Sequence, residues 1–209
     1  MREYIYIIPA ALLAISAHEF SHGYVSNKLG DPTPENNGRL TLNPLAHLDV
    51  WGVLCMIVFR MGWAKPVPIN PYYYKDRKKG IILVSLAGPL MNYLLTFVGL
   101  LLYGVCYKYN WSIGIWFYYF AIINVGLGTF NLIPIPPLDG SNVLGELAPQ
   151  VQTFYYKIKG YAPLILVGCL YLGILQRPMN LINDFVVQNF WKIIQNLLRI
   201  GVYTSGNFI

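Results

Sequence analysis

The stretch GIILVSLAGPLMNYLLTFVGLLLYGVCY, residues 80–107, contains no charged side chain and decides the fold class. It exceeds the roughly 20 apolar residues that a helix needs to cross the hydrocarbon core of a bilayer. A second uncharged run follows almost at once, over residues 109–138. Both runs predict membrane-spanning helices, and the tight connection at residues 108–111 predicts that these helices are antiparallel neighbours.

The composition also indicates a membrane protein. Of the 209 residues, 56% are hydrophobic and 11% are charged, whereas about 25% are charged in an ordinary soluble domain. The net charge of +6 could suggest nucleic-acid binding, but a cluster of cations at residues 75–79 directly precedes a predicted span. The positive-inside bias places such clusters in the cytoplasm. We therefore expect a lipid bilayer as a partner and no nucleic acid.

Two more segments are candidate spans. Residues 4–27 are apolar apart from His18, Glu19 and His22, and residues 160–176 are just long enough to cross. The chain begins with one Arg and one Glu rather than with the cationic start of a signal peptide, which indicates a retained span. The three cysteines are scattered through apolar sequence and predict no disulfide framework.

The segments between the spans predict shorter elements. The first helix, residues 4–29, should end where Gly30 and Pro32 follow it. Residues 38–43 alternate apolar with polar side chains, which favours a short strand or hairpin edge. Residues 50–62 are apolar but too short to cross, which indicates a re-entrant or interfacial segment.

Two segments are predicted at the membrane surface. Residues 65–79 combine prolines, three consecutive tyrosines and cations, as expected of an interfacial loop at headgroup level. Residues 181–198 carry an apolar stripe at helical period, which predicts a helix that lies along the surface.

The expected fold is an all-α polytopic membrane protein, a single domain over residues 1–209 with a core at about 4–150 and accessory helices at 151–209.

His18 and His22 lie four residues apart in the first predicted helix, and Glu19 lies between them. Residues at this spacing share one helix face about 6 Å apart along the axis, so both imidazoles can reach one zinc ion. Glu19 can then approach water as a general base. A chance pair of helical histidines is the alternative, but a charged residue at the centre of a span costs on the order of 2.5–3.5 kcal/mol to insert, which favours a functional site.

A catalytic zinc site usually has three protein ligands and one open position, so a third ligand is needed. Asp139 is the candidate among the nine acidic residues, because those other than Glu19 fall in predicted loops, termini or a surface helix. It follows three prolines at the end of the second long apolar run, where an interrupted helix frees backbone groups that lipid cannot satisfy. The predicted topology places Asp139 and both histidines on the same cytoplasmic side, with the N-terminus outside.

Three motifs in this order resemble the site-two protease family of intramembrane zinc metalloproteases. They are His18-Glu19-x-x-His22, Ala87-Gly88-Pro89-x-x-Asn92 and the run from Asn131 that ends in Pro137-Leu138-Asp139-Gly140. Residues 38–44 and 62–68 also resemble the short bacterial members that lack a PDZ domain. The resemblance spans most of the chain.

This resemblance implies a three-helix catalytic core that hydrolyses peptide bonds in or next to transmembrane segments of other proteins. His18, His22 and Asp139 would hold one Zn²⁺ ion. Glu19 would activate water, and Asn131 would polarise the scissile carbonyl. For Asn131 a merely structural, hydrogen-bonded role is an equal alternative.

The other polar residues of these motifs favour structural roles. Gly88, Pro89 and Asn92 are typical of a helix kink and a helix contact rather than of chemistry. His47 is typical of a turn or capping residue, and a further ligand or a proton carrier is its alternative role.

Two rival functions follow from the same residues. One is a catalytically silent membrane scaffold that binds transmembrane helices, which the intact site residues disfavour. The other is a metal transporter, for which no second set of intramembrane ligands is visible. A separate hypothesis is that a strand at residues 38–43 pairs with an unwound segment of the substrate. The sequence sets neither the substrate nor the oligomeric state.

Overall fold

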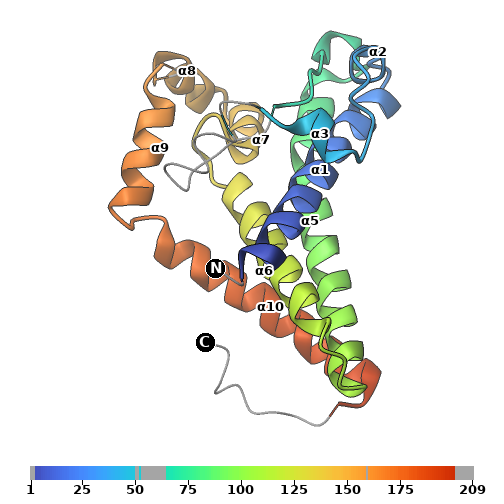
Figure 1. The fold of residues 1–209 in the computed structure, drawn as a ribbon. Helices are drawn as coiled ribbons and strands as arrows, with labels where there is room; N and C mark the ends of the chain where they lie inside the picture. The colour runs from blue at the N-terminus through green and yellow to red at the C-terminus, as the bar shows by residue number, and fades with distance from the viewer. Residues whose placement is uncertain (1–2, 50–51, 53–64, 159, 201–209) are drawn as a thin grey trace.

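The computed structural model describes residues 3–49, 52, 65–158 and 160–200, and its regular elements in these ranges are all helical. Figure 1 shows three long helices side by side, capped at one end by short helices and loops and crossed by a C-terminal helix. The elements are α1 (Tyr4–Lys28), α2 (Thr33–Asn36), α3 (Pro44–His47), η1 (Pro71–Tyr73), α5 (Arg77–Lys108), α6 (Gly114–Asn131), α7 (Asp139–Leu147), α8 (Pro149–Ile158), α9 (Ala162–Tyr171) and α10 (Gln176–Leu198).

The first two long helices confirm the prediction from the sequence. Helix α1 ends at Lys28, and Gly30 follows with a φ of 103°, a conformation that suits glycine. Helix α5 begins after Asp76, whose side chain accepts a hydrogen bond from the Lys79 amide. Both α1 and α5 are long and apolar enough to cross a membrane, and the bent pair of α9 and α10 makes a third span if it is counted as one.

Helix α6 is shorter than the uncharged run of residues 109–138 predicted. A turn at Asn110, with a φ of 58°, removes the start of the run, and the proline-rich loop at residues 132–138 removes its end. The remaining 18 residues extend about 27 Å, slightly less than the roughly 30 Å of the hydrocarbon core. Helix α6 therefore completes the three-helix core through its packing on α1 and α5 rather than through its own length.

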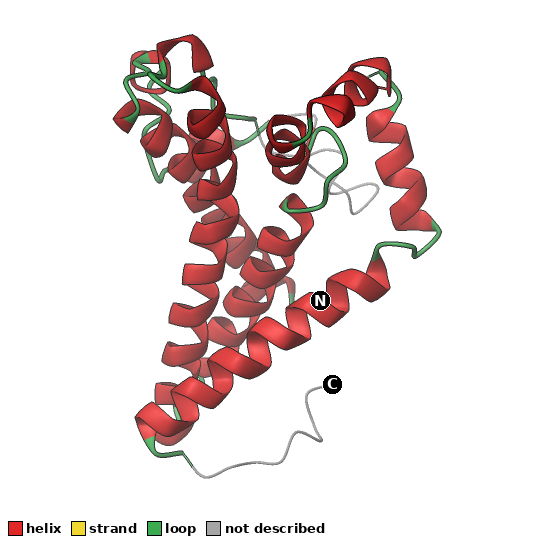
Figure 2. Ribbon diagram, turned by 180° about the vertical axis from the view of Figure 1, so that it is seen from behind, coloured by secondary structure: helices red, strands yellow, loops and turns green. Residues whose placement is uncertain are grey.

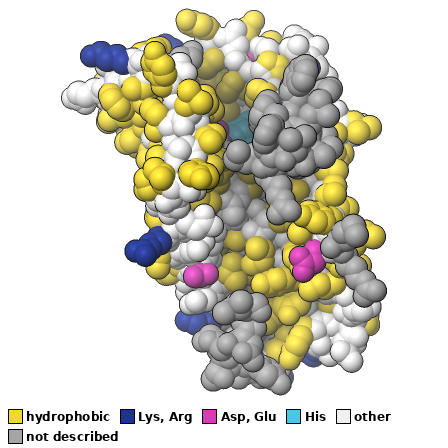
Figure 3. Space-filling view, turned by 60° about the vertical axis from the view of Figure 1, so that its left-hand side comes forward, with side chains coloured by type: hydrophobic (Ala, Val, Ile, Leu, Met, Phe, Trp, Pro, Cys, Tyr) yellow, Lys and Arg dark blue, Asp and Glu magenta, His cyan; other side chains and the backbone are white. Residues whose placement is uncertain are grey.

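The outer face of α5 is apolar, as a lipid-facing surface requires. Its exposed side chains recur at helical period along most of the helix, namely Leu83, Leu90, Leu94, Val98 and Leu102. Figure 3, which turns the side of α8 and α9 forward, shows hydrophobic side chains on another part of the surface as well, with few charged groups among them. The fold is that of an all-α polytopic membrane protein.

The C-terminal region differs from its prediction in two ways. The fourth candidate span, residues 160–176, forms only the ten-residue α9, which turns by 78° into α10. Helix α10 does not lie apart on the surface, because Ile194 is fully buried against Leu100 of α5 and Ala121 of α6. Phe190, Ile194 and Leu198 of the apolar stripe therefore pack on the three-helix core. Its other large side chains stay exposed, namely Leu181, Ile182, Phe185, Ile193 and Leu197.

Helix α10 runs along the length of that core. Near its start, Asn183 accepts a hydrogen bond of 2.6 Å from the Thr129 hydroxyl, close to the end of α6. Near its other end, the Leu198 carbonyl accepts a hydrogen bond of 3.0 Å from the Lys108 ammonium, at the end of α5. Since α5 and α6 are antiparallel, these two contacts lie at opposite ends of the bundle, as the diagonal course of the helix in Figure 2 shows.

The strand predicted at residues 38–43 is absent from the part of the chain that the structure describes, and these residues form a turn and an irregular segment. Local hydrogen bonds take the backbone groups that a strand would use. The Thr41 carbonyl accepts from His47 Nε2 at 2.8 Å, and the Asn43 amide donates to the Thr41 hydroxyl at 3.1 Å. The segment predicted to be re-entrant, residues 50–62, lies outside the described residues apart from Gly52.

The loop at residues 65–76 has an exposed and a buried side. Tyr72 and Tyr73 are exposed, as expected at headgroup level. Tyr74 is buried instead, and its hydroxyl lies 2.7 Å from the Ser26 hydroxyl at the end of α1. This tyrosine therefore holds the loop against α1 rather than facing lipid.

Candidate metal centre

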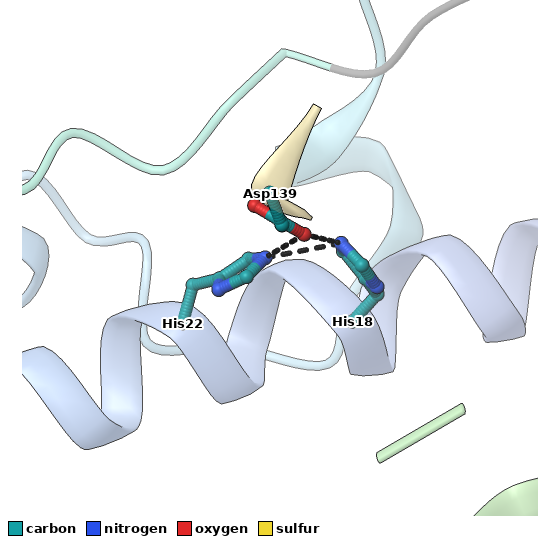
Figure 4. A group of neighbouring side chains, drawn as sticks. All are labelled: His18, His22 and Asp139. Carbon is teal, nitrogen blue, oxygen red and sulfur yellow. Dashed lines mark hydrogen bonds and ion pairs between the residues drawn. The ribbon is translucent and has the colours of Figure 1, made fainter. Parts of the chain in front are cut away.

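Two helices aim three ligand atoms at one point. His18 and His22 lie on one face of α1, and Asp139 is the first residue of α7 (Figure 4). Asp139 Oδ2 lies 3.2 Å from the Nε2 atom of each histidine, and the two Nε2 atoms are 3.0 Å apart. The residues that the sequence separated by more than a hundred positions thus form one compact cluster.

Hydrogen bonds at the opposite ring nitrogens set the orientation of both imidazoles. His18 Nδ1 lies 2.6 Å from Asn92 Oδ1, and His22 Nδ1 lies 2.7 Å from the Val84 carbonyl oxygen. Because a carbonyl oxygen only accepts, each Nδ1 atom carries the hydrogen and donates it. In the neutral rings, both Nε2 atoms therefore present lone pairs to Asp139, as metal-binding histidines do.

This donor set fits a zinc ion. Two Nε2 lone pairs and a carboxylate oxygen repel one another at about 3 Å unless a cation lies between them. Asp139 Oδ2 is buried and receives no hydrogen bond from any described residue. Ligands at 2.0–2.1 Å from a tetrahedral zinc ion are separated by about 3.3–3.4 Å, close to the separations found here.

Two glycines allow the helices to approach the cluster. A Cβ atom on Gly88 would lie 2.5 Å from His22 Nε2, so any side chain at this position of α5 would displace the imidazoles. A Cβ atom on Gly140 would lie 2.1 Å from the Leu132 carbonyl oxygen, so only glycine lets α7 start against the proline-rich loop. That loop turns through a hydrogen bond from the Leu138 amide to the Ile135 carbonyl and thereby points Asp139 at the histidines.

Comparison with known proteins identifies the family. A family model described as "Peptidase family M50" matches residues 107–172. The "Putative zinc metalloprotease YwhC" of Bacillus subtilis is 33% identical over 206 residues, which cover 92% of this chain and 94% of that protein. The chain belongs to peptidase family M50. The resemblance to site-two proteases that the motifs indicated is confirmed.

Other relatives match over shorter lengths. The "Putative zinc metalloprotease Rip2" of Mycolicibacterium smegmatis is 33% identical over 188 residues, which cover 83% of this chain and 70% of that protein. The "Protease RseP" of Photorhabdus luminescens is 34% identical over 76 residues, which cover 32% of this chain and 29% of that protein. No solved structure matches the chain. Together with the apolar helices, membership of M50 makes this a multi-pass membrane protein of a metalloprotease family.

The two remaining candidate residues, Glu19 and Asn131, form hydrogen bonds to groups outside the His18, His22 and Asp139 cluster. Glu19 follows His18 on α1, and its Oε2 atom accepts a hydrogen bond of 3.0 Å from the Val67 amide. Asn131 ends α6, and its amide nitrogen donates to the Leu127 carbonyl at 3.0 Å. Within the described residues, no hydrogen bond joins Asn131 to the His18, His22 and Asp139 cluster.

Asn92 is the residue beside the cluster whose contacts sequence reasoning underestimated. Its side chain accepts from His18, and its amide nitrogen donates to the Ala14 carbonyl at 3.2 Å and to Asn124 Oδ1 at 2.9 Å. All of this network is buried. A fully buried asparagine in a spanning helix needs partners of this kind, so its place in an apolar run was a signal for more than helix packing.

His47 does not join the cluster. It is buried, and its Nε2 atom donates to the Thr41 carbonyl within the same short segment. Its own carbonyl accepts a hydrogen bond of 2.9 Å from the Lys65 amide. These contacts match the turn-stabilising role expected for a histidine beside Asn43 and Pro44.

Proposed function

We propose that this M50 protein hydrolyses peptide bonds in or next to transmembrane segments of membrane proteins, with one Zn²⁺ ion held by His18, His22 and Asp139. The convergence of two Nε2 lone pairs and an otherwise unpartnered carboxylate oxygen carries the proposal. Relatives named as zinc metalloproteases support the same chemistry. A zinc ion bound there supplies a Lewis acid that polarises the peptide carbonyl and acidifies water.

Glu19 is the proposed general base. It follows the first histidine directly, and one of its carboxylate oxygens is held by the Val67 amide. The other oxygen, Oε1, has no hydrogen bond from a described residue, so it is free to take a proton from water. The same carboxylic acid can then return that proton to the amine that leaves, which is the usual exchange of base and acid roles.

Asn131 is the proposed donor to the scissile carbonyl. An amide N–H near the metal would stabilise the negative charge that develops on the carbonyl oxygen. The Asn131 amide nitrogen carries two hydrogens, and its bond to the Leu127 carbonyl uses one of them, so the second is available to the substrate.

We further propose that the protein lies in the cell membrane with the metal towards the cytoplasm. The cations of residues 75–79 lie just before α5 and in its first turn, at the end of the bundle where α1 ends, which is also the end that bears both histidines. The positive-inside bias assigns that end to the cytoplasm. The N-terminus then lies outside, and water reaches the site from the cytoplasmic face.

Three variants test this assignment. Glu19→Gln should keep zinc and lose hydrolysis, whereas His22→Ala and Asp139→Ala should lose both. Zinc is measured by mass spectrometry of the purified protein, and hydrolysis by comparing membrane peptides that accumulate in cells with and without the variant. Full hydrolysis by Glu19→Gln would refute the mechanism, and a wild type that holds zinc without any change in the peptides would favour the silent scaffold.

A further inference from the structure

A cavity of about 480 Å³ lies beside the metal ligands, on the side of α7 and α8. Its volume is in the range of about 300–1,000 Å³ that small-ligand pockets occupy. Pro137 and Ser141 line it on either side of Asp139, and Ser85 lines it next to Val84, whose carbonyl holds His22. Residues that line the cavity are thus close in sequence to Asp139 and to Val84, which holds His22.

The walls of the cavity carry hydrogen-bonding groups without partners. Ser85 is 4% exposed, yet its hydroxyl makes no hydrogen bond to a described residue. Asn142 of α7 is exposed and Gln152 of α8 is half-buried, and the side-chain amides of both are free to bond to a ligand in the cavity. The Ser85 oxygen itself is open to the cavity, so it offers a donor and an acceptor to a polar ligand in this space.

Both signs of charge line the same cavity. Arg77 comes from the start of α5 and Glu146 from α7, and no ion pair joins them in the described part of the chain. Ile69, Ile81 and the proline pair 136–137 supply flat apolar surface between these polar groups. A lipid acyl chain would leave the amides and the hydroxyl unsatisfied, so the walls fit a ligand that alternates donors and acceptors.

The geometry points to this cavity as a subsite for an extended peptide segment of the substrate, next to the scissile bond. An extended backbone presents N–H and C=O groups at each residue. The Ser85 hydroxyl and the Asn142 and Gln152 amides can accept hydrogen bonds from the first and donate to the second. The inference rests on the proposed peptidase function. It adds that a polar, unwound segment of the substrate, rather than a helix, occupies the space between α5, α7 and α8.

The test measures binding rather than turnover. Three probes share a zinc-binding hydroxamate. Acetohydroxamate has no peptide and is too small to reach the cavity. A peptidyl hydroxamate and a succinyl-linked peptide hydroxamate each carry an extended tripeptide, and the two tripeptides run in opposite chain directions from the hydroxamate. Calorimetry on the full-length, zinc-loaded protein in detergent gives the affinity of each probe. We expect at least one peptide arm to improve the affinity of the wild type about tenfold, as one or two net hydrogen bonds do.

Two cavity variants should remove that gain. Gly145→Leu fills the space, since a Cβ atom there meets only Gln152 and Tyr155 at 3.9 Å. The double variant Asn142→Ala with Gln152→Ala removes both amides. Thr153→Ala is the matched control, because its hydroxyl bonds to the Pro149 carbonyl on the exposed side of α8. Acetohydroxamate should bind all four proteins equally.

Each other outcome overturns one proposal and not the other. If neither arm improves affinity, or if both cavity variants keep the gain, the peptide subsite is wrong while the metal site stands. If the variants instead lose thermal stabilisation by short-chain phosphatidylethanolamine, the cavity holds a lipid headgroup and the peptide subsite is wrong. If acetohydroxamate binds no better to the wild type than to Asp139→Ala, the metal centre itself is refuted.

Discussion

The His18, His22 and Asp139 cluster and the C-terminal helix α10 contact the same long helices through different interactions, hydrogen bonds at the cluster and apolar packing along α10. Around His18 and His22, hydrogen bonds of 2.6–3.2 Å at the Nδ1 atoms and through Asn92 fix the positions of the rings. Along α10, contact depends on apolar side chains such as Ile194 packed against Leu100 and Ala121. Hydrogen bonds are directional while apolar packing tolerates small shifts, so the first region should fail in function and the second in stability.

The largest effect should come from Gly88→Ala. The added Cβ atom would lie 2.5 Å from His22 Nε2, so the imidazoles must move and zinc should be lost from the purified protein. Gly126→Ala is the control, because a Cβ atom there meets nothing within 4 Å. If Gly88→Ala retains stoichiometric zinc, the ligand positions described here are wrong.

Asn92→Ala should weaken zinc binding by about 10- to 100-fold, the range found when the partner of a metal-bound histidine is removed. The His18 Nδ1 hydrogen then lacks its acceptor, and the ring loses its fixed orientation. Zinc affinity is measured by competition with a chelator. Ser16→Ala is the matched control, since this buried hydroxyl bonds only to its own helix at Leu12. Equal affinity in both variants would show that the network does not orient the ligand.

Ile194→Ala probes the other side of the comparison. Truncation of a fully buried isoleucine removes packing contacts worth about 2–5 kcal/mol in soluble cores, so the thermal midpoint should fall while zinc affinity stays unchanged. Ile193→Ala removes the same atoms from a side chain that is 53% exposed and should leave the midpoint nearly unchanged. A loss of zinc in Ile194→Ala would mean that the two regions are coupled.

The smallest effect concerns Asp31, which joins the end of α1 to the loop that reaches Glu19. Burial raises the pKa of Asp31, but hydrogen bonds from Thr33, Asn70 and Ser26 outweigh burial and leave the pKa below its ordinary value. Its contribution to stability is therefore complete above the unfolded pKa of about 3.9 and is lost as the pH falls through the lower, folded pKa.

Asp31→Asn should lack this part of the acid dependence. Thermal midpoints of wild type and variant, measured from pH 6 down to pH 3, should converge at the acidic end. A difference between the two proteins that stays constant over this range would show that the carboxylate charge is not what stabilises the loop.

Much of the fold could be predicted because the spans depend on local composition. An uncharged run fixes α5 wherever it lies in the chain, and the glycine at position 30 fixes the end of α1. The strand at residues 38–43 was wrong because alternation alone does not reveal that Thr41 and His47 satisfy each other locally. The packing of one side of α10 on the core was not predicted, since an amphipathic stripe does not distinguish a membrane surface from a groove between helices. The position of its exposed side chains at a membrane surface stays a prediction.

The sequence by itself determined a membrane protein and the three residues that meet in the proposed metal centre, because buried ionisable groups in a span are too costly to occur without a partner. Only the tertiary structure decided which groups hold those ligands. The Val84 carbonyl carries no sequence signal at all, and Asn92 acquires its role only when α5 brings it against α1. Such contacts depend on distances between helices, which no single run of residues encodes.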